Sequence, residues 1–212
     1  MDLQTFFESF TGQLIVVIII AAILAVIFFL SGKDKKTHAR TIAISAALIA
    51  MAFVLNNFVP RIRLANGGSI TLFSMFVLFY VGYCFGTRNG ILAGMAYGLL
   101  DFLISPSAYY PMQIVLDYIL AFGLIGAGSI LRKQKYGIIT GYLLGVLGRY
   151  IASVMSGVIF FAEYAPEGLS PLVYSLLYNI SYMGIEAAAT VIVLLIKPVR
   201  ITLENLAKKY GI

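Results

Sequence analysis

Four polar residues interrupt the long apolar stretches of this 212-residue sequence. Asp117, Arg149, Asn179 and Glu186 each stand within a hydrophobic run long enough to cross a bilayer. A polar side chain is costly in hydrocarbon, so such residues mark a cavity, a pathway or a contact between helices. Carboxylate, amide and guanidinium groups at these positions could bind a small polar or cationic ligand.

Two of these residues are expected near the outer side of the membrane. At about 1.5 Å of rise per residue, Asp117 falls roughly 9 Å and Asn179 roughly 12 Å from the outer end of its helix. Other hydrogen-bonding side chains approach from the same side: Tyr109, Tyr110, Gln113 and Tyr174. Aromatic rings with a few polar groups and one carboxylate suit a small, flat, polar or cationic ligand. The alternative is that Asp117 and Asn179 only tie helices together, while the tyrosines form an interfacial belt.

Arg149 and Glu186 lie deeper, roughly 18 Å and 15 Å from the inner ends of their helices. At those depths the two side chains could meet near the middle of the membrane. We therefore expect an ion pair between them beneath the pocket, because opposite charges neutralise each other in a low-dielectric medium. The alternative is that Arg149 faces the cavity and contacts the ligand itself.

The elements that must position these residues are membrane helices. Hydrophobic residues make up 61% of the chain and charged residues 11%, about half the charge content of an average soluble protein. Apolar runs of spanning length recur along the chain, which predicts an all-α polytopic membrane protein. We expect seven apolar segments: 13–30, 41–59, 69–86, 91–105, 111–131, 137–161 and 171–196.

The positive charges predict the orientation of these helices. With the N-terminus outside and the C-terminus inside, twelve of the fifteen lysine and arginine residues fall on inner connections, and Arg61 and Arg63 on outer ones. Basic residues concentrate on the cytoplasmic side of membrane proteins. The net charge of +6 therefore indicates topology and contact with anionic lipid headgroups, and no nucleic-acid partner is expected.

The first helix differs from the other six. Its core has no polar residue between Leu14 and Leu30, and a basic linker, SGKDKKTHAR, follows it. We therefore expect an extra N-terminal transmembrane anchor with its linker over residues 1–37, and a six-helix membrane domain over residues 38–212. The only histidine, His38, is expected to be a solvated residue at the end of this linker.

Motifs for catalysis and nucleotide binding are missing from the sequence. It contains no G-x-x-x-x-G-K-[ST], no H-E-x-x-H and no G-x-S-x-G. The single cysteine, Cys84, lies in an apolar run, which excludes a disulfide framework and a metal cluster. We expect no enzymatic activity, no metal and no cofactor. The enzymatic alternative is an intramembrane enzyme that uses Asp101, Asp117 or Glu186, although these carboxylates are not spaced as a pair along the chain.

Small residues recur at spacing four in three segments: Ala43-x-x-x-Ala47, Gly94-x-x-x-Gly98 and Gly141-x-x-x-Gly145. Such pairs let membrane helices approach closely, and packing within the chain is the ordinary outcome for each. The Ala43 and Ala47 face is on the first helix of the six-helix domain, and it could instead dock a partner subunit.

Three stretches resemble the thiamine-specific substrate-binding component (S component) of energy-coupling factor (ECF) transporters: GGSITLFSM, PMQIVLDYILAFGLIGAG and SGVIFFAEYAPEG…YSLLYN. The resemblance covers about residues 38–200 and leaves the first helix unexplained. It implies a high-affinity subunit of the bacterial cytoplasmic membrane that captures thiamine, or a close analogue, at the outer face. Its implied partners are a transmembrane coupling protein, docked on the Ala43 and Ala47 face, and two cytosolic ATPases.

The resemblance also implies roles for individual residues. Asp117 matches the acidic residue of the family's L-[DE]-Y motif and is followed by Tyr118, while Tyr174 and Asn179 match its Y-S-L-x-x-N motif. Asp117 and Asn179 would hydrogen-bond the aminopyrimidine of thiamine, and the aromatic side chains would stack on its rings. The further contacts expected with the ligand are Tyr109, Gln113, Arg149, Ser153, Gly157 and Phe161.

The sequence departs from the family at two of these positions. Ser153 and Phe161 stand where some members carry histidine and tryptophan, so the ligand could be a thiamine fragment or analogue. A second alternative is a stand-alone secondary transporter of thiamine or a thiamine precursor, driven by an ion gradient. The outer segment 61–69, with Asn66, Gly67 and Gly68, is the expected lid because glycines permit motion.

Overall fold

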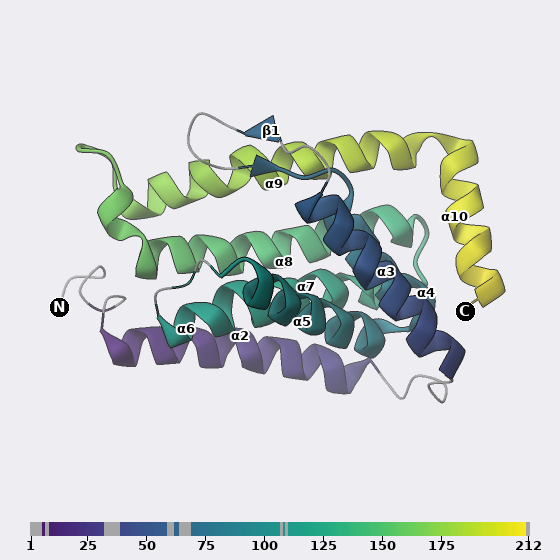
Figure 1. The fold of residues 1–212 in the computed structure, drawn as a ribbon, viewed down its shortest axis with the longest axis horizontal. Helices are drawn as coiled ribbons and strands as arrows, with labels where there is room; N and C mark the ends of the chain where they lie inside the picture. The colour runs from purple at the N-terminus through teal and green to yellow at the C-terminus, as the bar shows by residue number, and fades with distance from the viewer. Residues whose placement is uncertain are drawn as a thin grey trace.

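The computed structural model describes residues 6, 9–31, 39–58, 62–63, 69–106, 108 and 110–210. Within these ranges the chain is almost entirely helical, and most of its long helices run side by side (Figure 1). In chain order the elements are α2 (Phe10–Leu30), α3 (Ala39–Asn57), β1 (Ile62–Arg63), β2 (Ser69–Ile70), α4 (Ser74–Phe85), α5 (Thr87–Ile104), α6 (Pro111–Gln113), the π-helix η1 (Ile114–Leu120), α7 (Ala121–Ala127), the 3-10 helix η2 (Gly128–Leu131), α8 (Gly137–Phe160), the 3-10 helix η3 (Ala162–Tyr164), α9 (Pro171–Leu195) and α10 (Lys197–Tyr210).

The prediction of an all-α membrane protein is confirmed. In the described residues, five helical spans are long and apolar enough to cross a membrane: α2, α3, the continuous span Pro111–Leu131, α8 and α9. The predicted segments 111–131, 137–161 and 171–196 agree with the observed bounds to within one residue. The Pro111–Leu131 span and α9 each begin with a proline. Because proline suits the first turn of a helix, it marks the first residue of both helices in the sequence.

The predicted segment 69–86 is wrong at its beginning. Ser69 and Ile70 form β2, which pairs antiparallel with β1, and α4 begins only at Ser74. The twelve residues of α4 extend about 18 Å, less than the roughly 30 Å hydrocarbon core of a bilayer. All twelve are buried, since α3, α5, α7, α8 and α10 pack around them. Helix α4 is thus the centre of the bundle.

Helix α10 was not expected from the sequence, which places its residues in an inner tail. It turns sharply away from α9 at the C-terminal end of the chain (Figure 1). The hydroxyl of Tyr80 on α4 donates a hydrogen bond to the backbone oxygen of Leu203 at 2.7 Å, and Ala207 is fully buried. The guanidinium of Arg40 on α3 lies over the ring of Tyr210, 4.9 Å from its centroid. These contacts hold α10 against the ends of α3 and α4.

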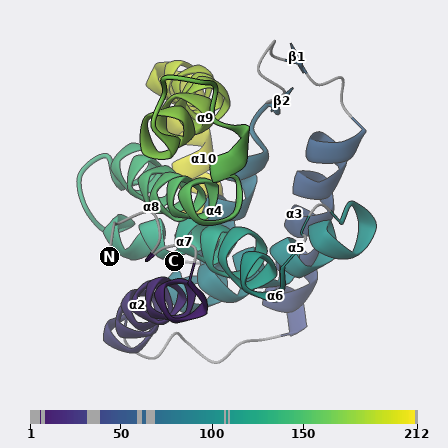
Figure 2. The same cartoon turned by 90° about the vertical axis from the view of Figure 1, so that its left-hand side faces the viewer.

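The extra N-terminal helix α2 packs along one side of the bundle, opposite α9 (Figure 2). Its buried side chains belong to the same apolar cluster as Leu116 and Leu120 of η1: Val16, Val17, Ile20 and Leu24. At its C-terminal end, Arg88 of α5 donates to the backbone oxygen of Phe28 at 2.8 Å and stacks on the Phe28 ring. The linker residues 32–38, including His38, lie outside the described residues.

Helix α5 makes very close contacts with η1 and with α7, which follows it. A Cβ atom on Gly98 would collide with the backbone oxygen of Tyr118, and one on Gly94 would collide with that of Phe122. Glycine is therefore required at both positions, and the predicted packing role of this pair is confirmed. The contact sets η1, which carries Asp117, at a fixed position relative to α5.

Candidate functional site

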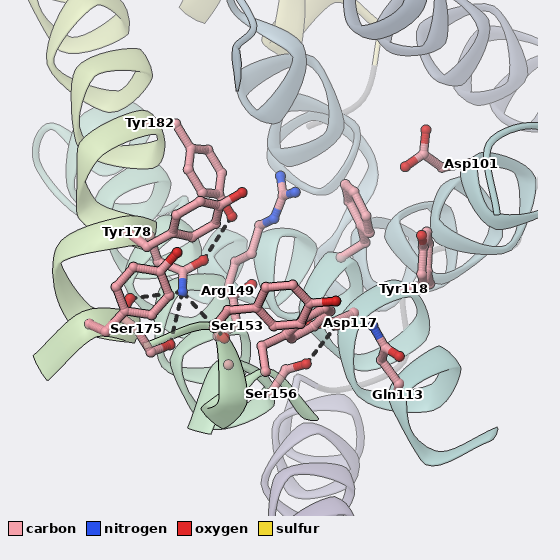
Figure 3. A pocket seen from close by; sticks show the side chains of 16 residues that line it. Asp101, Gln113, Asp117, Tyr118, Arg149, Ser153, Ser156, Ser175, Tyr178 and Tyr182 are labelled. Carbon is pink, nitrogen blue, oxygen red and sulfur yellow. Dashed lines mark hydrogen bonds between the residues drawn. The ribbon is translucent and has the colours of Figure 1, made fainter. Parts of the chain in front are cut away.

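A cavity of about 550 Å³ lies between the Pro111–Leu131 span, α8 and α9, with one wall residue from α5 (Figure 3). Nine of the ten ligand-contacting residues predicted from the sequence line it: Gln113, Asp117, Tyr118, Arg149, Ser153, Gly157, Phe161, Tyr174 and Asn179. The tenth, Tyr109, lies outside the described residues, as do Asn66, Gly67 and Gly68 of the expected lid. Segments separated by more than sixty residues thus supply one site.

Asp117 is half-buried in the wall of this cavity, on the π-helix η1. The hydroxyl of Ser156 on α8 donates a hydrogen bond to its Oδ2 atom at 2.6 Å, and the buried side chain of Gln113 lies beside it (Figure 3). Short π-helical stretches inside α-helices occur frequently at functional sites. The carboxylate is held in a defined position and retains acceptor capacity on its second oxygen.

A row of tyrosines from α9 forms the opposite wall. Tyr174, Tyr178 and Tyr182 follow one another at intervals of four residues, so they share one face of the helix. Their neighbouring ring centroids are 6.1 Å and 5.7 Å apart. This wall presents aromatic surface and hydroxyl groups to the cavity (Figure 3).

Asn179 joins this wall to α8. Its amide nitrogen donates to the backbone oxygen of Ser175 at 2.9 Å and lies 3.4 Å from that of Ser153, and its Oδ1 atom accepts from the Tyr182 hydroxyl at 2.8 Å. The contact with Ser153 ties α9 to α8, as one alternative from the sequence expects, whereas the other two bonds lie within α9. An amide oxygen can accept two hydrogen bonds, so Oδ1 can still accept from a ligand.

Gly157 allows α8 and α9 to approach closely at the cavity. A Cβ atom there would collide with the hydroxyl of Ser175, which donates to the backbone oxygen of Val154 at 3.0 Å. Any larger residue at this position would have to displace the Ser175 side chain. The prediction of a close approach at this glycine agrees with the structure.

The predicted ion pair between Arg149 and Glu186 is wrong. Both residues are described, yet the structure places no ion pair between them. The guanidinium of Arg149 lies over the ring of Phe122 instead, with its carbon 4.1 Å from the ring centroid. Arg149 lines the cavity, as the alternative expects, because Phe122 offers its cation a ring face there.

Glu186 is buried and has other partners. Its carboxylate accepts hydrogen bonds from the hydroxyl of Thr71 at 2.6 Å, the hydroxyl of Ser74 at 3.2 Å and the backbone N–H of Met75 at 3.1 Å. Three donors satisfy most of the acceptor capacity of a carboxylate. Glu186 therefore connects α9 to the beginning of α4.

Sequence reasoning missed several residues that line the cavity: Phe122, Ser156, Tyr164, Ser175, Tyr178 and Tyr182. Asp101 also lines it, although it was considered only as a possible catalytic carboxylate. The spacing of Tyr178 and Tyr182 from Tyr174 could have found two of them, since residues four apart share a helix face. No such spacing in the sequence identifies Phe122 or Ser156 as cavity residues. Their place at the cavity depends on how separate helices pack against each other.

The Ala43 and Ala47 face lies elsewhere, on α3. Both alanines are exposed, and Ala52 is the buried residue among those described for this helix. Neighbouring apolar side chains of α3 are exposed as well: Ile42, Met51 and Val54. A row of small residues is therefore accessible along the outside of α3.

Comparisons with known proteins agree on one family. The family model described as "Thiamine transporter protein" matches residues 42–205, a range that begins after α2. Thiamine transporter ThiT from Bacillus subtilis is 33% identical over 156 residues, which cover 66% of this chain and 81% of the relative. ThiT from Lacticaseibacillus paracasei is 30% identical over 113 residues, which cover 43% of this chain and 56% of the relative. The solved structure of ThiT from Listeria monocytogenes matches with a TM-score of 0.58 and 26% identity, over 80% of this chain and 93% of that one.

Proposed function

The chain belongs to the thiamine transporter family, and from this we propose that it captures thiamine with high affinity as the S component of an ECF importer. The family's function is transport and not catalysis, and the chain has the fold of an S component. A transmembrane coupling protein and two cytosolic ATPases would complete the importer in the cell membrane. In this assembly the chain supplies the vitamin-binding site.

The observation that carries this proposal is the position of Asp117 opposite the tyrosine row of α9. Thiamine joins a flat aminopyrimidine to a positively charged thiazolium ring. Asp117, held by Ser156, can accept a hydrogen bond from the exocyclic amino group. The ring faces of the tyrosines and of Phe161 attract the cation. One cavity thus offers a complementary surface to both halves of the vitamin.

Asn179 and Gly157 would set the shape of the site. The Oδ1 atom of Asn179 can accept a second hydrogen bond from the ligand while Tyr182 keeps its first. Gly157 keeps α8 close to α9, so the two walls remain at a separation that suits a flat ring. Ser153 presents a small side chain where some relatives carry an imidazole, which leaves room for a thiamine analogue.

The exposed face of α3 would dock the coupling protein. Ala43 and Ala47 are one turn apart and exposed, so a partner helix could approach the α3 backbone closely there. This face lies outside the cavity walls, which allows vitamin binding and docking to occur on one molecule at once. The orientation with the N-terminus outside would open the cavity toward the vitamin supply.

Calorimetric titration of the full, detergent-purified chain with thiamine tests the binding site. We expect the Asp117→Asn variant to bind thiamine roughly 100-fold more weakly, because it loses a charge-assisted hydrogen bond. The matched control is Glu163→Gln, at an exposed residue of η3. Absence of thiamine binding to the unmodified chain, or equal affinity of the two variants, would contradict the proposed site.

Transport assays in proteoliposomes test the partners. We expect thiamine to accumulate only when the coupling protein, the ATPases and ATP are present together with the chain. Accumulation by the chain alone under an ion gradient would instead support the stand-alone carrier considered from the sequence.

A further inference from the structure

Basic side chains gather at the end of the bundle where α9 meets α10. Residues 132–135, between η2 and α8, carry three of them, and α10 carries four. Among the residues that the structure describes at this end, Glu204 is the one carboxylate, and it lies 3.7 Å from the Nε atom of Arg200. The cations far outnumber this acid, so this end of the protein can attract an anion.

The ring of Tyr136 brings two of these cations together. The guanidinium carbon of Arg200 lies 5.0 Å from the centre of the ring, and the ammonium nitrogen of Lys135 lies 5.6 Å from it. Lys197 precedes Arg200 by three residues, so the two side chains are neighbours on the surface of α10. We call this group of residues the corner, because it joins the beginning of α8 to the beginning of α10: Lys135, Tyr136, Lys197 and Arg200.

Tyr136 has an unusual backbone conformation for so large a residue. It precedes the first residue of α8 with a φ angle of 61°, in the left-handed region. A bulky side chain is strained there, and strained residues are found where binding sites and switches require them. The ring is exposed, so burial does not hold it in place. The contacts with Arg200 and Lys135 are the interactions that this conformation makes possible.

An exposed apolar stripe runs along α8 from the corner. Leu143, Leu144, Leu147 and Ile151 follow Tyr136 at intervals that place them on one face of the helix, and each is between 41% and 52% exposed. An exposed apolar face of a membrane helix is in contact with lipid chains. The corner lies at the end of this stripe, where tyrosine and basic side chains usually meet the lipid headgroups.

Helix α10 lies at the same depth. It crosses the end of the bundle, whereas α8 and α9 run along it (Figure 1). Its exposed residues include both apolar and basic side chains, among them Ile201, Leu206, Lys208 and Lys209. Helices with this mixture lie in the plane of the membrane interface. The cations of α10 are therefore placed beside headgroups and not within hydrocarbon.

We propose that the corner binds the headgroup of an anionic phospholipid, whose chains lie along the α8 stripe. The terminal nitrogens of Arg200 can donate to two phosphate oxygens, while its Nε atom faces Glu204. Lys135 and Lys197 add positive charge on either side. A zwitterionic lipid would bring a cation of its own close to these residues, so an anionic headgroup is preferred. The proposal does not depend on what fills the larger cavity.

Native mass spectrometry of the full, detergent-purified chain tests the site, with equal amounts of phosphatidylglycerol and phosphatidylcholine. We expect the chain to retain phosphatidylglycerol about tenfold more strongly, because each basic residue near an anionic headgroup favours binding. The double variant Lys135→Gln/Arg200→Gln should lose most of this preference. The matched control Lys208→Gln/Lys209→Gln removes the same charge from the other end of α10 and should keep it. Equal losses in the two double variants would indicate a diffuse basic surface and overturn the proposal.

Tyr136→Gly tests the corner without strain. Glycine adopts a positive φ angle freely, so we expect this variant to fold and its melting temperature not to fall. It lacks the ring that holds Lys135 and Arg200 together, so its preference for phosphatidylglycerol should fall by about threefold or more. An unchanged preference in this variant and in Lys135→Gln/Arg200→Gln overturns the proposal.

Two further measurements identify the source of the anion. Displacement of phosphatidylglycerol by an equal concentration of glycerol phosphate would indicate a site for soluble phosphates, and it overturns the assignment to lipid. So does a Lys135→Gln/Arg200→Gln variant that keeps its lipid preference but no longer binds the ATPase subunits, because the corner would then contact a protein. Thiamine affinity should be the same in all these variants, since the corner is outside both cavities. The lipid measurements need no vitamin, so they remain decisive even if the chain binds no thiamine.

Discussion

Gly94 and Gly98 of α5 are buried, whereas Ala43 and Ala47 of α3, at the same spacing of four, are exposed. The glycines face a backbone that approaches so closely that no Cβ atom fits between the two helices. The alanines face no other part of the described chain at such a distance. The same spacing is therefore buried against a neighbouring backbone in α5 and left exposed in α3.

The surroundings of the two helices explain this difference. Helix α5 packs against α4, η1 and α7 in the interior of the bundle. Helix α3 contacts α4 and α5 with one face and leaves the other to its surroundings. A small residue in the interior is a steric requirement, whereas the exposed alanines of α3 meet no such requirement within the described chain. Four substitutions test this difference between α5 and α3 and the contacts that surround it, from the largest expected effect to the smallest.

The largest effect is expected for Gly98→Leu. The new side chain would collide with the Tyr118 backbone and displace η1, so we expect a loss of roughly 3 kcal/mol of stability or more, and no thiamine binding. Thermal melting of the purified protein measures this loss. The matched substitution Ala47→Leu on α3 should change the free energy of unfolding by no more than about 0.5 kcal/mol, as substitutions at exposed positions usually do. Similar melting of both variants would remove the distinction between the two faces.

Ala47→Leu should instead impair transport. A bulky residue in the exposed row would keep a partner helix away from α3, so we expect transport by the complete importer to fall by about tenfold or more. Thiamine affinity, measured by calorimetry, should remain unchanged. The control is Ala188→Leu, which adds the same bulk to an exposed position of α9. Normal transport by Ala47→Leu would exclude this face as the docking site.

Arg88→Gln tests a contact of the interior with α2. Arg88 caps the end of α2 through two backbone oxygens and the Phe28 ring, so its loss should lower stability by about 1–2 kcal/mol. We also expect weaker thiamine binding, because α2 packs against Leu116 and Leu120 beside Asp117. Lys133→Gln, at an exposed position, is the control. Unchanged melting and affinity would mean that α2 does not support the pocket.

The smallest effect is expected for Asn56→Ala, which breaks the hydrogen bond from α3 to Asp101 of α5. Loss of one partly buried hydrogen bond should lower stability by about 1 kcal/mol. Hydrogen–deuterium exchange should rise at the end of α3 next to Asn56. The neighbouring variant Asn57→Ala removes a bond within α3 itself, from its amide to the Phe53 backbone oxygen, and should leave α5 protected. Identical exchange in both variants would show that this bond does not couple α3 to the pocket.

Much of the site was predictable because it depends on residue type within helices of predictable length. Asp117, Tyr174 and Asn179 stand out as polar groups in apolar segments, and their depth follows from the rise of a helix. The expected ion pair between Arg149 and Glu186 was wrong, because it was inferred from depth in the membrane alone. Depth along a helix does not specify rotation about its axis, and Glu186 faces the donors at the beginning of α4.

The sequence by itself determined the membrane class, most of the helix bounds and the residue types that gather at the pocket, because each of these follows from local apolar length and composition. The tertiary structure was needed to show that α4 is a short central helix, that η1 is a π-helix and that a second, smaller cavity shares a wall with the larger one. It also decided which row of small residues is buried. These features depend on contacts between segments far apart in the chain, where the fit of one backbone against another sets the outcome.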